Sequence, residues 1–310
     1  MSFKASAPGS LMLLGEYAVL HGKHALVCAV DRRISVTLTP RDDQQIVITS
    51  AIGKLTTTPA DLKIAPPFQF VLATLKKFRR QLTHGCDIEI VSEFSDQIGL
   101  GSSAAVTTAL FAALTAMLQI TVTPQAMIKK IRAIIRSVQG LGSGADVAAC
   151  VLGGIVVYKA APLHTEKLTG TIPLTAAYAG YKTPTATAVR QVTEFFAQQP
   201  LIFQKLCHAI DECALQGAEL VRSKNWRELG KVMNMQQGLM ESLGVNTPEL
   251  AEAITILRTH PEIFGAKISG SGLGDCVIGL GVATSLSFNN NKIALVPVQM
   301  STQGVRCEKI

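Results

Sequence analysis

A glycine- and serine-rich loop directly precedes an apolar stretch in GLGSSAAVTTAL, residues 99–110. Unpaired N–H groups at a helix start and the positive end of the helix dipole attract anions, and glycine lets a phosphate approach the backbone closely. Serine hydroxyls can add hydrogen bonds or a ligand for Mg²⁺. The loop predicts either an anion-binding helix start or an ordinary serine N-cap, and it is not a Walker A loop because GxxxxGK[ST] is absent. The candidate anion-binding residues are Gly99, Leu100, Gly101, Ser102, Ser103 and Ala104.

A single carboxylate lies in a second glycine-rich stretch, QGLGSGADVAACVLGG, residues 139–154. Asp146 falls one turn into a short apolar helix that begins after GSG. A carboxylate among alanines and valines is costly to bury without a partner. Asp146 therefore predicts a general base or a hydroxyl-orienting group, and the alternative is a helix-start carboxylate stabilised by the helix dipole.

Two further glycine-rich stretches lie near the two ends of the chain. The first is APGSLMLLGEYAVLHGKHAL, residues 7–26, in which Glu16, His21 and Lys23 fall in the turns. The second is SGSGLGDC, residues 269–276, whose small residues remove bulk where a ligand or another backbone comes close. Taken alone, each is equally typical of an ordinary hairpin.

The bulk composition favours a large buried core. The 310 residues are 48% hydrophobic and 16% charged, with a mean hydropathy of +0.31. The longest apolar runs fall short of the roughly 18 residues that a membrane span needs, and the opening MSFKASAPGS does not read as a secretory leader. We therefore expect a cytoplasmic protein without a membrane partner.

The distribution of charged residues and of cysteines argues against a nucleic-acid-binding protein and against one with paired cysteines. The net charge is +7, but the basic clusters KKFRR and KKIRAIIR lie on amphipathic helix patterns whose charged faces we expect to be solvated. Aromatic residues are few, so we expect no nucleic-acid partner. None of the seven cysteines forms a CxxC pair, which predicts reduced, mostly packed thiols.

Hydrophobic periodicity places these motifs on an α+β framework. Alternation predicts strands at residues 25–30, 33–40, 44–50 and 86–94, and near the chain's end at 265–281, around a glycine loop, and at 293–299. Helical spacing predicts helices at residues 67–82, 103–118, 123–139, 200–222, 225–242 and 248–259, and a buried strand follows the glycine pair at 153–154. The order predicts two lobes, residues 1–165 and 166–310.

Taken in order, PGSLMLLGEYAVLHG, GLGSSAA and KISGSGLGDC resemble the three motifs of the GHMP kinase superfamily, across essentially the whole chain. GEYAVLHGK and SGADVAA are most similar to the mevalonate-pathway branch. The resemblance implies an N-terminal lobe like ribosomal protein S5 domain 2 and a C-terminal ferredoxin-like lobe. It implies transfer of the ATP γ-phosphate to mevalonate, with phosphomevalonate as the alternative acceptor and a catalytically inactive nucleotide-binding homologue as a further alternative.

The resemblance also implies roles for individual residues. The 99–104 loop would hold the ATP phosphates, with Ser103 near Mg²⁺, and Asp146 would face the acceptor hydroxyl. ATP and Mg²⁺ are thus the implied cofactors and a small molecule the implied partner, with a homodimer left open. The residues expected to border the acceptor are Glu16, Tyr17, His21, Thr185, Ser271 and Gly272.

Three positions depart from the family pattern. Ser10 replaces the usual lysine of the first motif, so we expect Lys23 or Lys182 to supply the missing cation. Ile135 stands where related kinases often carry a Mg²⁺-binding glutamate, eleven residues before the aspartate. Tyr17 stands where mevalonate kinases usually have histidine. This tyrosine and the GDC triplet favour phosphomevalonate as the acceptor, whereas the HGK turn and the compact length favour mevalonate. Mevalonate is the acceptor that we expect.

Overall fold

The alternating residues of the first forty positions form a long antiparallel pair of strands, β1 (Phe3–Leu14) and β2 (His24–Pro40). The computed structural model describes residues 1–95 and 97–310. Two separate strands were predicted over β2, and this was wrong. Arg33 continues the strand because its guanidinium is buried and donates to the backbone oxygens of Ser6 and Gly304, so the charged segment in mid-strand is not a turn.

Eight strands form the first sheet, in the order β12-β1-β2-β5-β3-β4, with β6 added on β2 and β7 on β6. The N-terminal part of β2, residues 24–28, pairs with β6, and its C-terminal part, residues 34–40, pairs with β5. Strand β2 therefore runs along the whole length of the sheet. The remaining strands of this sheet are β3 (Ile46–Ser50), β4 (Gly53–Thr57), β5 (Cys86–Ser92), β6 (Ile155–Ala160), β7 (Leu163–Leu168) and β12 (Arg306–Lys309).

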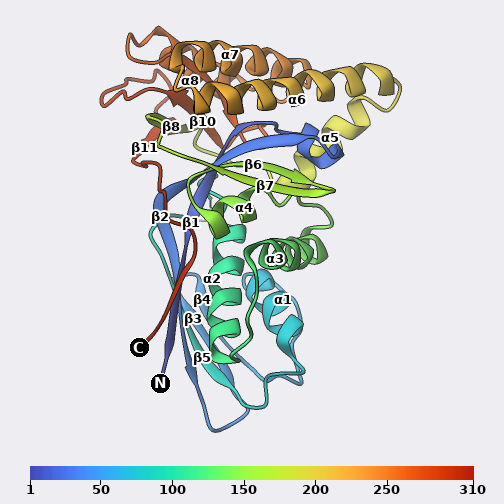
Figure 1. The fold of residues 1–310 in the computed structure, drawn as a ribbon, viewed down its shortest axis with the longest axis vertical. Helices are drawn as coiled ribbons and strands as arrows, with labels where there is room; N and C mark the ends of the chain where they lie inside the picture. Colours follow the sequence, from blue (N-terminus) through green and yellow to red (C-terminus); the bar gives the residue numbers. More distant parts are fainter. Residues whose placement is uncertain (96) are drawn as a thin grey trace.

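Four helices pack together on one face of the first sheet (Figure 1). The central one, α2, is apolar over nearly its whole circumference because it is buried between β1, β2 and the other helices. The short helix η1 (Ala18–His21) lies in the turn between β1 and β2. The four helices are α1 (Gln69–Phe78), α2 (Ser102–Met117), α3 (Pro124–Gln139) and α4 (Ala145–Leu152).

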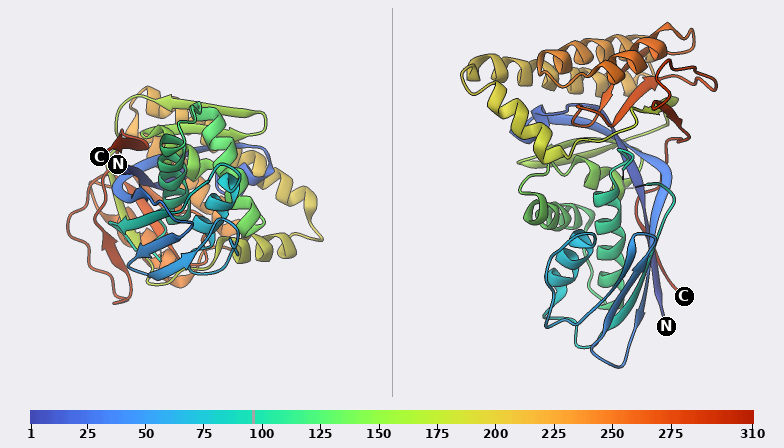
Figure 2. Two further views of the ribbon diagram at one scale, coloured as in Figure 1. Left: turned by 90° about the horizontal axis from the view of Figure 1, so that it is seen from below. Right: turned by 180° about the vertical axis from the view of Figure 1, so that it is seen from behind.

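The second sheet has four antiparallel strands in the order β11-β8-β10-β9. When these four strands are numbered along the chain, their order in the sheet is 4-1-3-2. This is the strand order of the expected ferredoxin-like lobe. Helices α6–α8 lie together at the far end of the molecule, with α7 and α8 against β9 (Figures 1 and 2). The elements are β8 (Leu174–Tyr178), α5 (Thr185–Phe195), α6 (Pro200–Arg222), α7 (Trp226–Ser242), α8 (Pro248–Thr259), β9 (Gly265–Ser269), β10 (Cys276–Leu280) and β11 (Ala294–Val296).

The α+β fold with two lobes is confirmed, with local corrections. The predicted strand at 293–299 is only three residues long, and the last strand is β12, which returns to pair with β1. Helix α5 was not predicted. The proposed boundary between residues 165 and 166 falls inside β7, whereas the change of sheet lies between β7 and β8.

The core comprises one cluster around the first sheet and a second around β8–β10 and α8. Tyr17 and Ala18 of the first glycine-rich motif belong to the second cluster, so this turn packs against the other lobe. All seven cysteines are unpaired thiols and only Cys307 is exposed, as predicted. Among the described residues, no helix is long and apolar enough to cross a membrane.

Candidate active site

The glycine-rich motifs meet around one cavity of about 1380 Å³. This exceeds the usual size of a small-molecule site and leaves room for two ligands side by side. Both lobes contribute to its wall. Residues from the first lobe that line it include Ser10, Glu16, Tyr17, Gly99, Gly101, Ser102, Ser103, Ala104, Arg132 and Asp146. Residues from the second lobe include Tyr181, Lys182, Thr185, Ser269, Ser271 and Asp275.

The 99–101 loop holds the start of α2 open toward this cavity. Gly101 is the N-cap, in a left-handed conformation with φ of 67°, and no side chain of the described residues caps the helix. The predicted alternative of a serine N-cap is therefore wrong, because Ser102 is already the first helical residue. The uncapped N–H groups remain available to an anion. Leu100 is buried outside the lining, and its carbonyl accepts from the Ser10 N–H at 3.0 Å.

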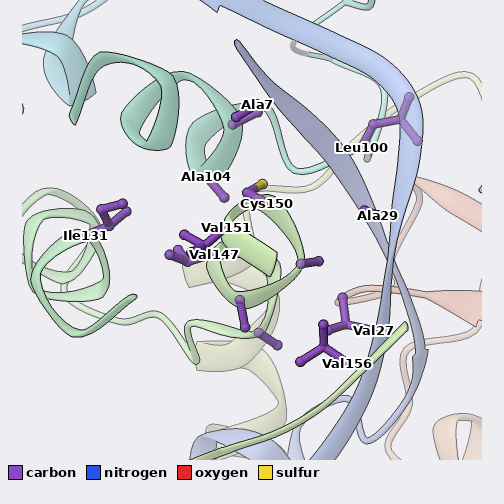
Figure 3. Close-up of a cluster of buried hydrophobic side chains, with 14 of the residues drawn as sticks. Ala7, Val27, Ala29, Leu100, Ala104, Ile131, Val147, Cys150, Val151 and Val156 are labelled. Carbon is purple, nitrogen blue, oxygen red and sulfur yellow. The ribbon is translucent and has the colours of Figure 1, made fainter. Parts of the chain in front are cut away.

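Asp146 is held at the base of the cavity by the packing of α4. Figure 3 shows Val147, Cys150 and Val151 on α4 packed among side chains of β1, α2 and α3, which fixes the helix. The Asp146 carboxylate accepts a hydrogen bond from Ser10 Oγ at 2.8 Å. Burial raises the pKa of Asp146, although the Ser10 hydrogen bond and the charge of Lys182 lower it. A partly buried, oriented carboxylate of this kind can accept a proton from a hydroxyl group.

The two candidate cations are placed very differently. Lys182 lines the cavity, and its charge lowers the pKa of both Asp146 and Asp275. Lys23 lies outside the lining and forms an ion pair with Asp211 at 3.7 Å. The structure therefore gives Lys182, and not Lys23, a position from which to act on a ligand.

The residues expected to border the acceptor are only partly brought together. Tyr17 lines the cavity, and its hydroxyl donates to the carbonyl oxygen of Ser271 at 2.7 Å, which joins the first motif to the third. Thr185 and Ser271 also line the cavity. His21 lies outside it, with its ring edge-on to Phe203 at 5.0 Å. Gly272 is likewise outside, packed against Val245.

Glu16 lies on the cavity wall but is engaged by the protein itself. Its carboxylate forms a fully buried ion pair with Lys267 Nζ at 2.5 Å and accepts from the side-chain amide of Gln236. The N–H of Gly270 also donates to it, at 3.4 Å. Glu16 therefore ties the first motif to β9 and to the start of the 270–275 loop, instead of presenting an unused charge to a ligand.

Two residues in the cavity wall were missed by sequence reasoning. Arg132 belongs to a basic cluster that was expected to be solvated, yet it lines the cavity and donates through Nε to the Gly142 carbonyl at 3.2 Å. Asp275 is buried beside Gly99 and faces the same cavity. The GDC triplet was noted only as a family feature; a lone carboxylate at the end of a glycine loop was the signal for Asp275.

The oxygen atoms around the 99–103 loop suit a hard cation such as Mg²⁺. Ser102 and Ser103 line the cavity, and Asp275 Oδ1 is buried without accepting a hydrogen bond from any described residue. Burial raises the pKa of Asp275 to about 6, against the lowering effects of Lys182 and the Gly99 N–H. A buried carboxylate beside a phosphate-binding loop, with one oxygen that accepts no hydrogen bond from the described residues, is consistent with a site completed by a cation.

Comparison with known proteins identifies the family to which this chain is similar. The family model described as "GHMP kinases N terminal domain" matches residues 69–154, and "GHMP kinases C terminal" matches residues 218–286. The chain is 31% identical to a mevalonate kinase of Archaeoglobus fulgidus, over 89% of this chain and 91% of that one. It is 27% identical to a mevalonate kinase of Pyrococcus abyssi, over 99% and 98%. A solved Lin0012 protein from Listeria innocua shares the fold, with a TM-score of 0.86, 22% identity and complete coverage of both chains.

Proposed function

The chain belongs to the GHMP kinase family, and we propose that it transfers the γ-phosphate of ATP to the 5-hydroxyl of mevalonate. The observation that carries the proposal is the meeting of the uncapped start of α2, the partly buried Asp146 and Lys182 in one cavity. The relatives named mevalonate kinase, matched over nearly the full length, favour this acceptor.

Each of these groups has a task that fits phosphoryl transfer, in which positioning and charge neutralisation supply most of the catalysis. The N–H groups of the 99–103 loop hold the phosphates at the helix start. Asp146, oriented by the 2.8 Å hydrogen bond from Ser10, orients the acceptor hydroxyl and accepts its proton as the new P–O bond forms. Lys182 offsets the negative charge that gathers on the transferred group.

Magnesium is proposed as the accompanying cation, with Ser103 among the residues that would hold it. When bound, Mg²⁺ neutralises charge on the phosphate oxygens and fixes their orientation. The cytoplasm, where ATP is maintained, is the proposed compartment, and a homodimer is the proposed assembly. The division into two lobes is likewise a proposal, with its boundary moved from residues 165–166 to the segment between β7 and β8, where the chain changes sheet.

The charges on the cavity wall favour mevalonate over phosphomevalonate. Among the described residues that line the cavity, Arg132 and Lys182 carry positive charge, and Arg132 is already bonded to Gly142. ATP brings several negative charges, and mevalonate adds one carboxylate. Phosphomevalonate would add a phosphate with a further charge of about −1.5 to −2, for which the wall offers little compensation.

An acceptor panel tests the proposal directly. ADP release is measured with mevalonate, phosphomevalonate, homoserine and galactose, with Asp146→Asn as the catalytic control. We expect turnover with mevalonate and a loss of at least about 100-fold in kcat for Asp146→Asn, with ATP still bound. Turnover with phosphomevalonate alone would replace the acceptor, and ATP binding without any product would indicate the inactive homologue.

A further inference from the structure

Asp275 combines two features that destabilise the fold, and its carboxyl lies directly against Gly99. Its side chain is buried, with 7% exposure, and Oδ1 has no hydrogen-bond partner among the described residues. Its backbone φ is 74°, in the left-handed region where a residue other than glycine is strained. A Cβ at position 99 would collide with the Asp275 carboxyl, so this carboxyl is packed directly against the first glycine of the 99–101 loop. A residue that costs the fold this much is better explained by a ligand than by packing.

The backbone around Asp275 holds this carboxylate in place. Its N–H donates to the Tyr181 carbonyl at 2.7 Å, and its own carbonyl accepts from the Ala179 N–H at 2.9 Å. Both bonds reach the segment between β8 and α5, on the second-lobe side of the cavity. The carboxylate is therefore presented by an anchored loop end, directly against the first glycine of the 99–101 loop.

The local charges leave room for a divalent cation. Asp275 is buried and Asp146 partly buried on this cavity wall, and the charge of Lys182 acts on both. One lysine leaves two ionised carboxylates with an excess negative charge, before any phosphate enters. Within residues 1–95 and 97–310 no three His, Cys, Asp or Glu side chains form a metal cage. Mg²⁺ is commonly bound by one or two carboxylates together with substrate phosphates, which is the arrangement available here.

We propose that Asp275 is a carboxylate ligand of the divalent cation that enters with ATP. The position at which the family resemblance places a metal-binding glutamate is Ile135, a buried apolar residue of α3 that cannot bind a cation. Asp275 supplies an oxygen ligand from the opposite lobe, so that cation and nucleotide bridge the cavity. This inference rests on the proposed use of ATP.

The test is the effect of Mg²⁺ on ATP affinity, measured by titration calorimetry in excess Mg²⁺ and again in EDTA. In Asp275→Asn we expect the gain in affinity from Mg²⁺ to fall at least about tenfold. ATP affinity in EDTA should stay equal or improve, because the substitution removes a negative charge near the phosphates. Asparagine tolerates a left-handed backbone, so the variant should fold and its ligand-free Tm should not fall. Asp61→Asn, on an exposed turn, is the matched charge control and should change neither affinity.

Two outcomes would contradict the inference. An unchanged Mg²⁺ effect in Asp275→Asn would show that the carboxylate is not a ligand, and an equal loss of ATP affinity in both media would show that it only supports the loop. Turnover of the unmodified protein with mevalonate is measured in parallel. A protein without turnover whose Mg²⁺ effect still depends on Asp275 would overturn the proposed acceptor and leave the metal ligand standing.

Discussion

The sequence left Lys182 and Lys23 as equal candidates for the cation that replaces the usual lysine at Ser10, and their surroundings in the structure favour Lys182. The charge of Lys182 acts on two carboxylates at the cavity wall, Asp146 and Asp275, whereas Lys23 pairs with Asp211 outside it. We expect Lys182→Met to lower kcat by about 100-fold or more, because removing a charge that stabilises the transition state has effects of this size. Lys23→Met should change kcat only a few-fold. Steady-state assays with mevalonate check both, and equal losses would contradict the assignment.

Ser10 has a role of its own at the position where the family carries lysine. It is buried, and its hydroxyl donates to Asp146 while its N–H donates to the Leu100 carbonyl. We expect Ser10→Ala to lower kcat about tenfold with little change in the Kd for ATP, because the Asp146 carboxylate loses its orienting bond of about 1.5–3 kcal/mol. The measurement is kcat beside calorimetric ATP binding. A fall in ATP affinity without a fall in kcat would place Ser10 in the nucleotide site instead.

At the scale of the elements, the start of α2 depends on one glycine. Gly101 has φ of 67°, and a side chain there would meet Ser10 Oγ, whereas Gly140 at the end of α3 has φ of 77° with open space around it. We expect Gly140→Ala to cost about 1–2 kcal/mol of unfolding free energy from backbone strain alone. Gly101→Ala should cost more and also weaken ATP binding. Urea unfolding and ATP titration compare the two variants, and equal effects would show that the loop tolerates a side chain.

The elements also show which structure can be predicted from local pattern. Helices α6, α7 and α8 follow from long periodic stretches, with proline at the start of α6 and α8, and their bounds were predicted to within one residue. β12 carries the exposed sequence RCEK and exists only because β1 offers a partner from the other end of the chain. Local pattern could not identify Asp275 as a site residue for the same reason, because its carboxyl lies against Gly99, which is distant in the sequence.

At the scale of the whole molecule, the two lobes are joined by the buried pair of Glu16 and Lys267. Removing one partner leaves an uncompensated buried charge, so we expect Lys267→Met to cost about 3–5 kcal/mol of unfolding free energy. The double variant Glu16→Gln with Lys267→Met should recover part of that loss. The exposed pair of Asp61 and Lys63 is the comparison, for which Asp61→Asn should cost less than about 1 kcal/mol. Urea unfolding of the unchanged protein, Glu16→Gln, Lys267→Met and the double variant gives the coupling energy, and a coupling near zero would contradict an energetic link between the lobes.

The pairing of β12 with β1 joins residues from the two ends of the sequence, and the termini lie side by side in Figure 1. Ser2 and Ile310 exchange two backbone hydrogen bonds of 2.9 Å at this edge. During translation the N-terminal residues leave the ribosome first, so β1 waits with an open edge until residues 306–309 emerge. An exposed edge strand is a template for pairing with other chains. The nascent protein is therefore most vulnerable to aggregation in the interval before its last strand is synthesised.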